Sequence, residues 1–255
     1  MRRPYIGVTG VMTYKEADFL SNLMPENSER DVMVGVLASL KTLRGQENNY
    51  KNRYPGVGHI SNIFSPFTKN TLNFVHYNTK EPNSITDQLF WLMDVAGPNC
   101  DGVQLNMVWP DADAIYQFRK RYESKKIVLQ VGGRAFKAVG NNPFRLAMRV
   151  YYYRDFVDYV LLDPSGGTGT AFDTEQMMAY LRSLRDLGLE KYMGFVVAGG
   201  LSPTTLNLVE PLIPEFPDLS TDVETGVRDV NDNLDLNVAR EYVRGAYSIF
   251  TKTAG

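Results

Sequence analysis

The sequence predicts one α/β domain, a closed barrel of eight parallel strands with a helical segment after each strand. Short apolar runs alternate with longer amphipathic segments along the whole chain. The length of 255 residues is the usual size of one (β/α)8 barrel, the TIM-barrel architecture. No linker or low-complexity run divides the chain, so residues 1–255 are expected to form a single domain. A doubly wound open sheet is the alternative, but it would leave the last two strand–helix units unexplained.

The strands are expected where short runs of branched and aromatic residues lie between turn residues. These runs are 5–8, 32–37, 72–77, 102–107, 127–131, 159–163, 194–198 and 219–223.

Helices are expected between these strands, and several have recognisable start signals. Ser84 and Asp87 have the spacing of a capping box, and Asp173 precedes a run of helix formers. Asn142 and Ser202 each precede a proline, which favours the first helical position. Only the interval after the second strand lacks a clear helical pattern. The expected helices are 14–24, 84–96, 111–124, 143–156, 174–188, 203–213 and 236–250.

Composition excludes several classes of function. The formal net charge of -2 gives no general attraction to nucleic acid or to an anionic membrane. A single cysteine, Cys100, excludes a disulfide framework and a multi-cysteine metal site, and it fits a cytoplasmic protein. The basic start of the chain is a poor signal peptide, and no run approaches a membrane span. Motifs for metal or nucleotide binding are absent from the sequence, so we expect neither a metal nor a cofactor.

Polar residues stand at the ends of most of the predicted strands. The carboxyl ends of the strands in a parallel barrel meet at one mouth, where reacting groups gather. Several such residues at the same relative place predict a polar bowl rather than ordinary solvated strand ends. They are His76, Gln104, Asn106, Gln130, Asp163 and Asp222.

Three of these residues have side chains that suit proton transfer. Asp163 ends the sixth strand, and a partly desolvated carboxyl there can serve as a general acid. His76 or Asp222 is the candidate base. Asn106 is a candidate for an amide contact to the ligand. The alternative for Asp163 is a structural role, in which its carboxylate accepts hydrogen bonds from backbone N–H groups of the loop that follows. For His76, only one of the two possible strand registers turns its side chain into the bowl.

Glycines follow the last three strands. They are Gly166 and Gly167 after the sixth, Gly199 and Gly200 after the seventh, and Gly226, beside Thr225, after the eighth. A glycine lets backbone N–H groups approach an anion closely, and barrels often bind a phosphate at these loops. We therefore expect a small phosphorylated ligand here; the alternative is that the glycines only form tight turns.

The segment 38–60 is a long basic stretch with interspersed tyrosines. The candidates for a lid that closes over the barrel mouth and clamps a second anionic group are Lys41, Arg44, Lys51 and Arg53, with Tyr50 and Tyr54 among them. A solvated loop is the simplest alternative. Nucleic-acid binding is disfavoured because the rest of the chain has no basic surplus.

The last third of the chain resembles the phosphoribosylanthranilate isomerases. The resemblance rests on VLLDPSGGTGTAFD, VVAGGLSPTTLNLV and STDVETGVRD, which occur in the order of that family's last three strands, and on IGVTGVMTYKEA near the start. It implies a (β/α)8 barrel that rearranges a phosphoribosyl amine, with Asp163 at the position of the family's general acid.

The family's catalytic base has no counterpart in this alignment. Matching the family's CGIT to IGVT puts Ile6 in the place of a cysteine, and Ile6 has no proton acceptor. Glu224 and Thr225 replace two serines of the family's eighth-strand loop. We therefore expect a related phosphosugar- or phosphometabolite-binding isomerase with a different reaction. The alternative is a barrel that binds a phosphometabolite without catalysis. Oligomeric state is left open.

Overall fold

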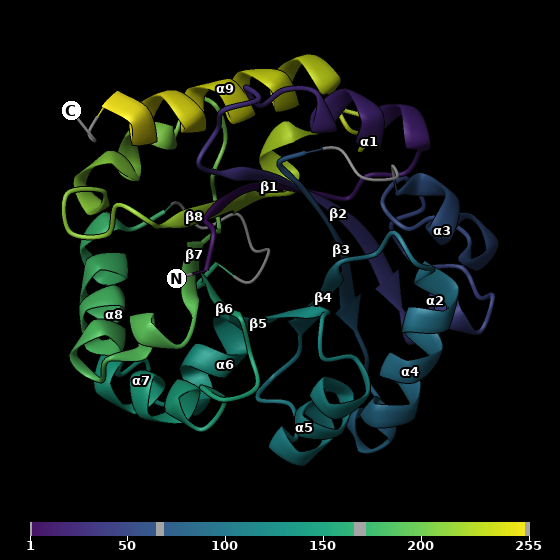
Figure 1. Ribbon diagram of the computed structural model, residues 1–255, viewed down its shortest axis with the longest axis horizontal. Coiled ribbons are helices and arrows are strands. Elements are labelled where there is room, and N and C mark those ends of the chain that lie inside the picture. Colours follow the sequence, from purple (N-terminus) through teal and green to yellow (C-terminus); the bar gives the residue numbers. More distant parts are fainter. Residues whose placement is uncertain (1, 65–68, 166–171, 253–255) are drawn as a thin grey trace.

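The computed structural model describes residues 2–64, 69–165 and 172–252 as one closed barrel surrounded by helices (Figure 1). The strands follow in the order β1 to β8, β8 pairs with β1, and all eight pairings are parallel. The predicted fold class is thus confirmed, and every expected strand is present. The strands are β1 Tyr5–Thr9, β2 Asp31–Ser39, β3 Thr71–Asn78, β4 Gly102–Asn106, β5 Lys126–Gly132, β6 Tyr159–Asp163, β7 Gly194–Val197 and β8 Ser220–Val223.

Helices form the outer ring that covers the barrel (Figure 1). Those described are α1 Tyr14–Ser21, α2 Leu40–Leu43, α3 Ile60–Ile63, α4 Ile85–Ala96, α5 Ala112–Arg121, α6 Gly133–Ala138, α7 Pro143–Tyr151, α8 Thr174–Asp186 and α9 Leu236–Lys252. Short 3₁₀ turns occupy Val57–His59, Pro82–Ser84, Leu189–Lys191, Leu206–Leu208, Glu210–Leu212 and Thr225–Val227.

Of the four expected helix caps, those at Asn142 and Asp173 are confirmed, and those at Ser84 and Ser202 are wrong. The side chains of Asn142 and Asp173 accept hydrogen bonds from the backbone N–H groups of the third helical residue of α7 and α8. Ser84 makes no such bond. A 3₁₀ turn runs directly into α4 there. The Ser84 hydroxyl donates back to the Glu81 backbone oxygen at 3.5 Å and accepts from the Gln88 side chain at 2.7 Å.

The expected helix 203–213 is wrong. Its place is taken by the two 3₁₀ turns Leu206–Leu208 and Glu210–Leu212. Pro211 has no N–H to donate within a helix. The Thr205 hydroxyl donates to the backbone oxygen of Gly200 at 3.0 Å and accepts from Ser202 N–H at 2.8 Å, so it binds to the preceding loop, and such local bonds compete with helix formation.

The interval after β2, where no helical pattern was found, contains the short helices α2 and α3. Ser39 begins α2 with a capping box: its hydroxyl accepts from Thr42 N–H, and the Thr42 hydroxyl accepts from Ser39 N–H at 3.1 Å. Helices this short carry too few apolar repeats for their period to be recognised in a sequence.

Inside the barrel, an apolar floor supports the mouth. Its buried members include Tyr5, Phe74, Val128 and Leu161, and the Tyr5 ring packs edge-on against Phe74, with ring centroids 6.1 Å apart. Side chains two residues apart on a strand share a face. The next inward residues after this floor are therefore the polar ones at the strand ends, and the floor sets the depth of the site.

None of the helices in the described part of the chain is long and apolar enough to cross a bilayer.

Candidate active site

A cavity of about 460 Å3 lies at the carboxyl ends of the strands. Five side chains named from their strand ends line it together: His76, Gln104, Gln130, Asp163 and Asp222. All five are at most 9% exposed. Five different strands, β3, β4, β5, β6 and β8, supply them, so the closed barrel brings distant parts of the sequence into one polar layer above the apolar floor.

Asp222 is the most strongly perturbed carboxyl of the cavity. Burial raises its pKa to about 7, and the like charges of Glu224 and Asp163 act in the same direction. The Thr9 hydroxyl donates to Asp222 at 3.0 Å and the Gln104 amide donates at 3.3 Å, which opposes part of that shift. A carboxyl with this pKa exchanges its proton close to neutral pH.

The neighbouring strand leaves room for the Asp222 carboxylate. A Cβ at Gly7 of β1 would lie 2.6 Å from Asp222 Oδ1, so a side chain at this inward position would collide with the carboxylate. Ile6 belongs to the buried layer outside the barrel, between strands and helices. Beside Asp222, β1 therefore offers only the Thr9 hydroxyl.

Asp163 lies at the end of β6, and among the residues that the structure describes Ser165 and Gln130 donate to it. The Ser165 hydroxyl donates to Asp163 Oδ1 at 2.6 Å, and the Gln130 amide donates to Oδ2 at 3.2 Å. A Cβ at Gly199 would lie 2.7 Å from Asp163 Oδ1, so the missing side chain at 199 lets the β7 loop pack against the carboxylate. The Asp163 and Asp222 carboxyls are thus joined through hydrogen-bonded glutamines, because Gln104 also donates to Gln130 at 3.2 Å.

His76 faces the cavity, which settles the register that the sequence left open. Its Nδ1 lies 3.4 Å from the Gln104 amide nitrogen; in the tautomer whose Nδ1 accepts from that amide, Nε2 carries the proton. Burial lowers the pKa of His76, so the ring is neutral at pH 7, although the charges of Glu224 and Asp163 oppose the shift. Within the described residues, His76 Nε2 and Gln104 Oε1 are buried without a hydrogen-bond partner. A ligand can supply an acceptor for the first and a donor for the second.

The glycine loops form the other wall of the cavity, with Gly199, Gly200, Thr225 and Gly226 among its lining residues. Gly199 and Gly200 have φ values of +94° and +68°, a conformation that favours glycine. A Cβ at Gly226 would lie 2.0 Å from the backbone oxygen of Leu201, so the β7 and β8 loops approach closely only because residue 226 is glycine.

Gly166 and Gly167, the other two predicted phosphate contacts, lie outside the described residues.

Lys41 and Arg44 lie elsewhere at the barrel mouth, along a neighbouring cavity of about 440 Å3 at the ends of β2 and β3. The Arg44 guanidinium donates to both carboxylate oxygens of Glu81, at 2.7 and 2.9 Å. The basic residue of this segment that reaches the glycine loops is Arg53, one of the four basic residues expected in the lid. Charge and spacing along the segment give no signal that separates Arg53 from its basic neighbours.

Asn106 ends β4 on the same face as Gln104, two residues beyond it, and is not among the described residues that line the cavity. The amide that the structure brings to the other polar side chains is therefore that of Gln104.

Cys100 precedes β4, at the end of the barrel opposite the cavity, where it is buried and burial raises its pKa to about 12. It cannot act as a base at the mouth. The described residues contain no group of three or more His, Cys, Asp or Glu side chains that could hold a metal ion.

Solved structures similar to this chain are phosphoribosylanthranilate isomerases. The enzyme from Thermus thermophilus has a TM-score of 0.61 at 15% identity, covering 99% of each chain. The enzyme from Thermotoga maritima has a TM-score of 0.60 at 21% identity, covering 97% of this chain and 100% of that one. Another structure of such an isomerase, in complex with reduced 1-(o-carboxyphenylamino)-1-deoxyribulose 5-phosphate, has a TM-score of 0.58 at 19% identity, with coverage of 97% and 100%. At these identities the similarity establishes a shared fold. No protein-family model and no curated protein sequence matches the chain.

Proposed function

We propose that this protein is an isomerase-type enzyme that moves a proton on a small phosphorylated substrate. The observation that carries the proposal is the convergence of Asp163, Asp222 and His76 in one cavity whose opposite wall is made of glycine loops. Acid/base isomerisation needs two proton-transferring groups on one substrate, and glycine loops at the ends of the last strands suit a phosphate.

Asp222 is the favoured base. Its pKa of about 7 lets the carboxylate form accept a proton at neutral pH and the carboxyl form return it. Asp163 is the favoured acid. It lies across the cavity from Asp222 and is connected to it through the hydrogen bonds of Gln104 and Gln130.

His76 has a different role in this proposal. Its ring is neutral, and Nε2 has no hydrogen-bond partner among the described residues. In the tautomer whose Nε2 carries the proton, it can donate a hydrogen bond to a substrate oxygen. A neutral imidazole in this position polarises a carbonyl group and stabilises the negative charge that develops when a neighbouring carbon loses a proton.

The substrate is proposed to differ from phosphoribosylanthranilate. The structural relatives are named for that substrate, but β1 of this chain places Gly7 and Thr9 beside Asp222 and turns Ile6 outward. The same observation favours the second candidate, a phosphometabolite-binding barrel without catalysis. The two candidates share the phosphate site and differ in proton exchange.

Replacing Gly200 by alanine is expected to weaken binding of inorganic phosphate by about 1–3 kcal/mol, because a methyl group at the cavity wall disturbs the backbone donors. Titration calorimetry measures the effect. Gly188→Ala is the matched control: its φ of +69° imposes the same backbone strain as the +68° at Gly200, and nothing lies within 4 Å of an added Cβ. Equal phosphate affinity in the two variants would show that Gly200 serves only the turn.

A further inference from the structure

The proposed phosphate site contains a charge that opposes it. Glu224 directly precedes Thr225 and Gly226 and lines the same cavity. Together with Asp163 and Asp222 it makes three acidic side chains among the described lining residues, which include no lysine or arginine. The sequence of 166–171 adds no charged residue. A free carboxylate beside the β8 loop would repel a phosphate.

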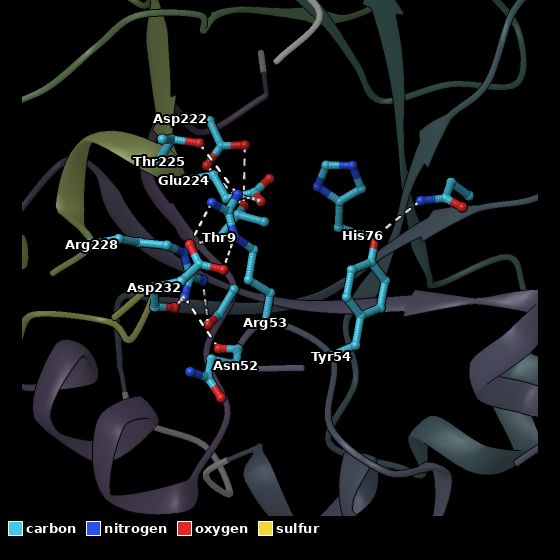
Figure 2. A network of polar contacts seen from close by, with 12 residues as sticks. Thr9, Asn52, Arg53, Tyr54, His76, Asp222, Glu224, Thr225, Arg228 and Asp232 are labelled. Atoms are coloured by element: carbon cyan, nitrogen blue, oxygen red, sulfur yellow. Dashed lines mark hydrogen bonds and ion pairs between the residues drawn. The ribbon is translucent and has the colours of Figure 1, made fainter. Parts of the chain in front are cut away.

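Arg53 places a positive charge beside this carboxylate (Figure 2). Its Nη1 donates to Glu224 Oε1 at 2.7 Å and to the Thr225 hydroxyl at 3.3 Å. The Arg53 side chain is only 15% exposed, so solvent screens this ion pair less than it screens a surface pair. The guanidinium therefore lies at the edge of the proposed phosphate site although Arg53 comes from the segment between β2 and β3.

A second carboxylate fixes the orientation of the guanidinium. Asp232 accepts from Arg53 Nε at 2.9 Å and from Nη2 at 2.6 Å (Figure 2). Hydrogen bonding to Asp232, and then to Glu224, raises the pKa of Arg53, which keeps its charge. Because Asp232 holds the guanidinium from this side, Nη1 already points at Glu224 before a ligand binds.

The position of Glu224 shows what the ion pair prevents. Glu224 is the residue before the 3₁₀ turn Thr225–Val227, yet its side chain makes no capping hydrogen bond to that turn. Backbone N–H groups at the start of a turn attract a nearby carboxylate, because charge-assisted hydrogen bonds are strong. Here the carboxylate is drawn toward Arg53, away from the donors that the proposal assigns to phosphate.

We infer that Arg53 is a positioning residue of the phosphate site, because it neutralises Glu224 and holds its carboxylate off the backbone donors of Thr225–Gly226. The inference rests on the proposed phosphate site and adds to it the reason why an acidic residue is compatible with that site. A different role, in which Arg53 only fastens its segment to the β8 side of the barrel, makes different predictions for variants of Glu224.

The test is calorimetric titration of the full chain with inorganic phosphate at constant ionic strength, with folding checked by circular dichroism. Arg53→Met leaves Glu224 uncompensated and is expected to weaken phosphate binding about tenfold. Glu224→Gln removes the opposing charge and is expected to bind phosphate as well as wild type or more tightly. The double variant is expected to return to near the wild-type affinity. Arg182→Met, which breaks an ion pair with Glu215 away from the cavity, is the control and is expected to stay close to wild type.

Several results would overturn the inference. Wild-type affinity in Arg53→Met, a double variant as weak as Arg53→Met, or weaker binding in Glu224→Gln each assigns Arg53 a fastening role only. If Arg53→Met does not fold, Glu224→Gln still tests the inference, because this variant keeps Arg53 and removes only the opposing charge. Absence of phosphate binding in wild type is a distinguishable failure, because it removes the proposed phosphate site and the inference with it.

Discussion

Asp222→Asn is expected to remove about 4 kcal/mol of pH dependence from the free energy of unfolding. Burial raises the pKa of Asp222 from 3.8 to about 7, and each tenfold change in proton affinity corresponds to about 1.4 kcal/mol. Below pH 3.8 the carboxyl is protonated in both the folded and the unfolded state. Between pH 3.8 and about 7 the folded state holds a proton that the unfolded state has lost, so the contribution of Asp222 to stability falls as the pH rises.

Urea unfolding of wild type and Asp222→Asn at pH 4 to 8 measures this contribution as a difference between two profiles. Asparagine has no carboxyl to ionise, so the variant gains stability relative to wild type as the pH rises toward 7. Asp31→Asn is the control, because burial raises the pKa of Asp31 only to about 6 and its contribution should therefore end at lower pH. A constant difference between wild type and Asp222→Asn across this range would contradict a raised pKa at Asp222.

Asp163→Asn and Asp222→Asn are each expected to slow proton exchange on the substrate by about 10²–10⁴-fold, the usual contribution of a general acid or base. The assay follows deuterium incorporation into a panel of aldose and ketose phosphates in D2O by NMR. The assay tests the whole panel for the same signal, because an acid/base isomerase of this type exchanges a carbon-bound proton of its substrate. Phosphoribosylanthranilate belongs in the panel and is expected to react poorly, since β1, with the sequence YIGVT, contains no side chain that acts as a base at neutral pH.

Asp173→Asn is the matched control for both variants. Asp173 caps α8 outside the cavity, so the same chemical change there should leave exchange at the wild-type rate. Full exchange in Asp163→Asn and Asp222→Asn would remove the catalytic roles proposed for them. Phosphate binding without exchange of any substrate would favour the non-catalytic candidate.

The strands and the polar layer were predictable from sequence because each depends on a local pattern. An apolar run that ends in a polar residue predicts both a strand and a side chain at the barrel mouth, as for Asp163 and Asp222. His76 needed the structure, because a shift of one residue in register would have turned its side chain to the other face. The failed helix at 203–213 reflects a local competition that Pro211 and the Thr205 hydroxyl decide.

The contacts of Arg53 with the β8 side of the barrel could not be predicted, because its partners lie far along the chain. Glu224 and Asp232, its two carboxylate partners, are more than 170 positions away, at separations of 171 and 179 residues. Lys41 and Arg44 have the same charge and stand nearer to the end of β2, but Arg44 is paired with Glu81. The sequence therefore predicts a basic segment over the mouth without showing which cation meets which acid.

The most direct test of the account is a crystal structure of the protein soaked with phosphate. The account predicts one phosphate against the backbone N–H groups of Gly199–Gly200 and Thr225–Gly226, with the Asp163 and Asp222 carboxyls facing the space next to it. Phosphate bound at another place on the molecule, or a cavity that stays free of phosphate at saturating concentration, would contradict a phosphate-binding site at this barrel mouth.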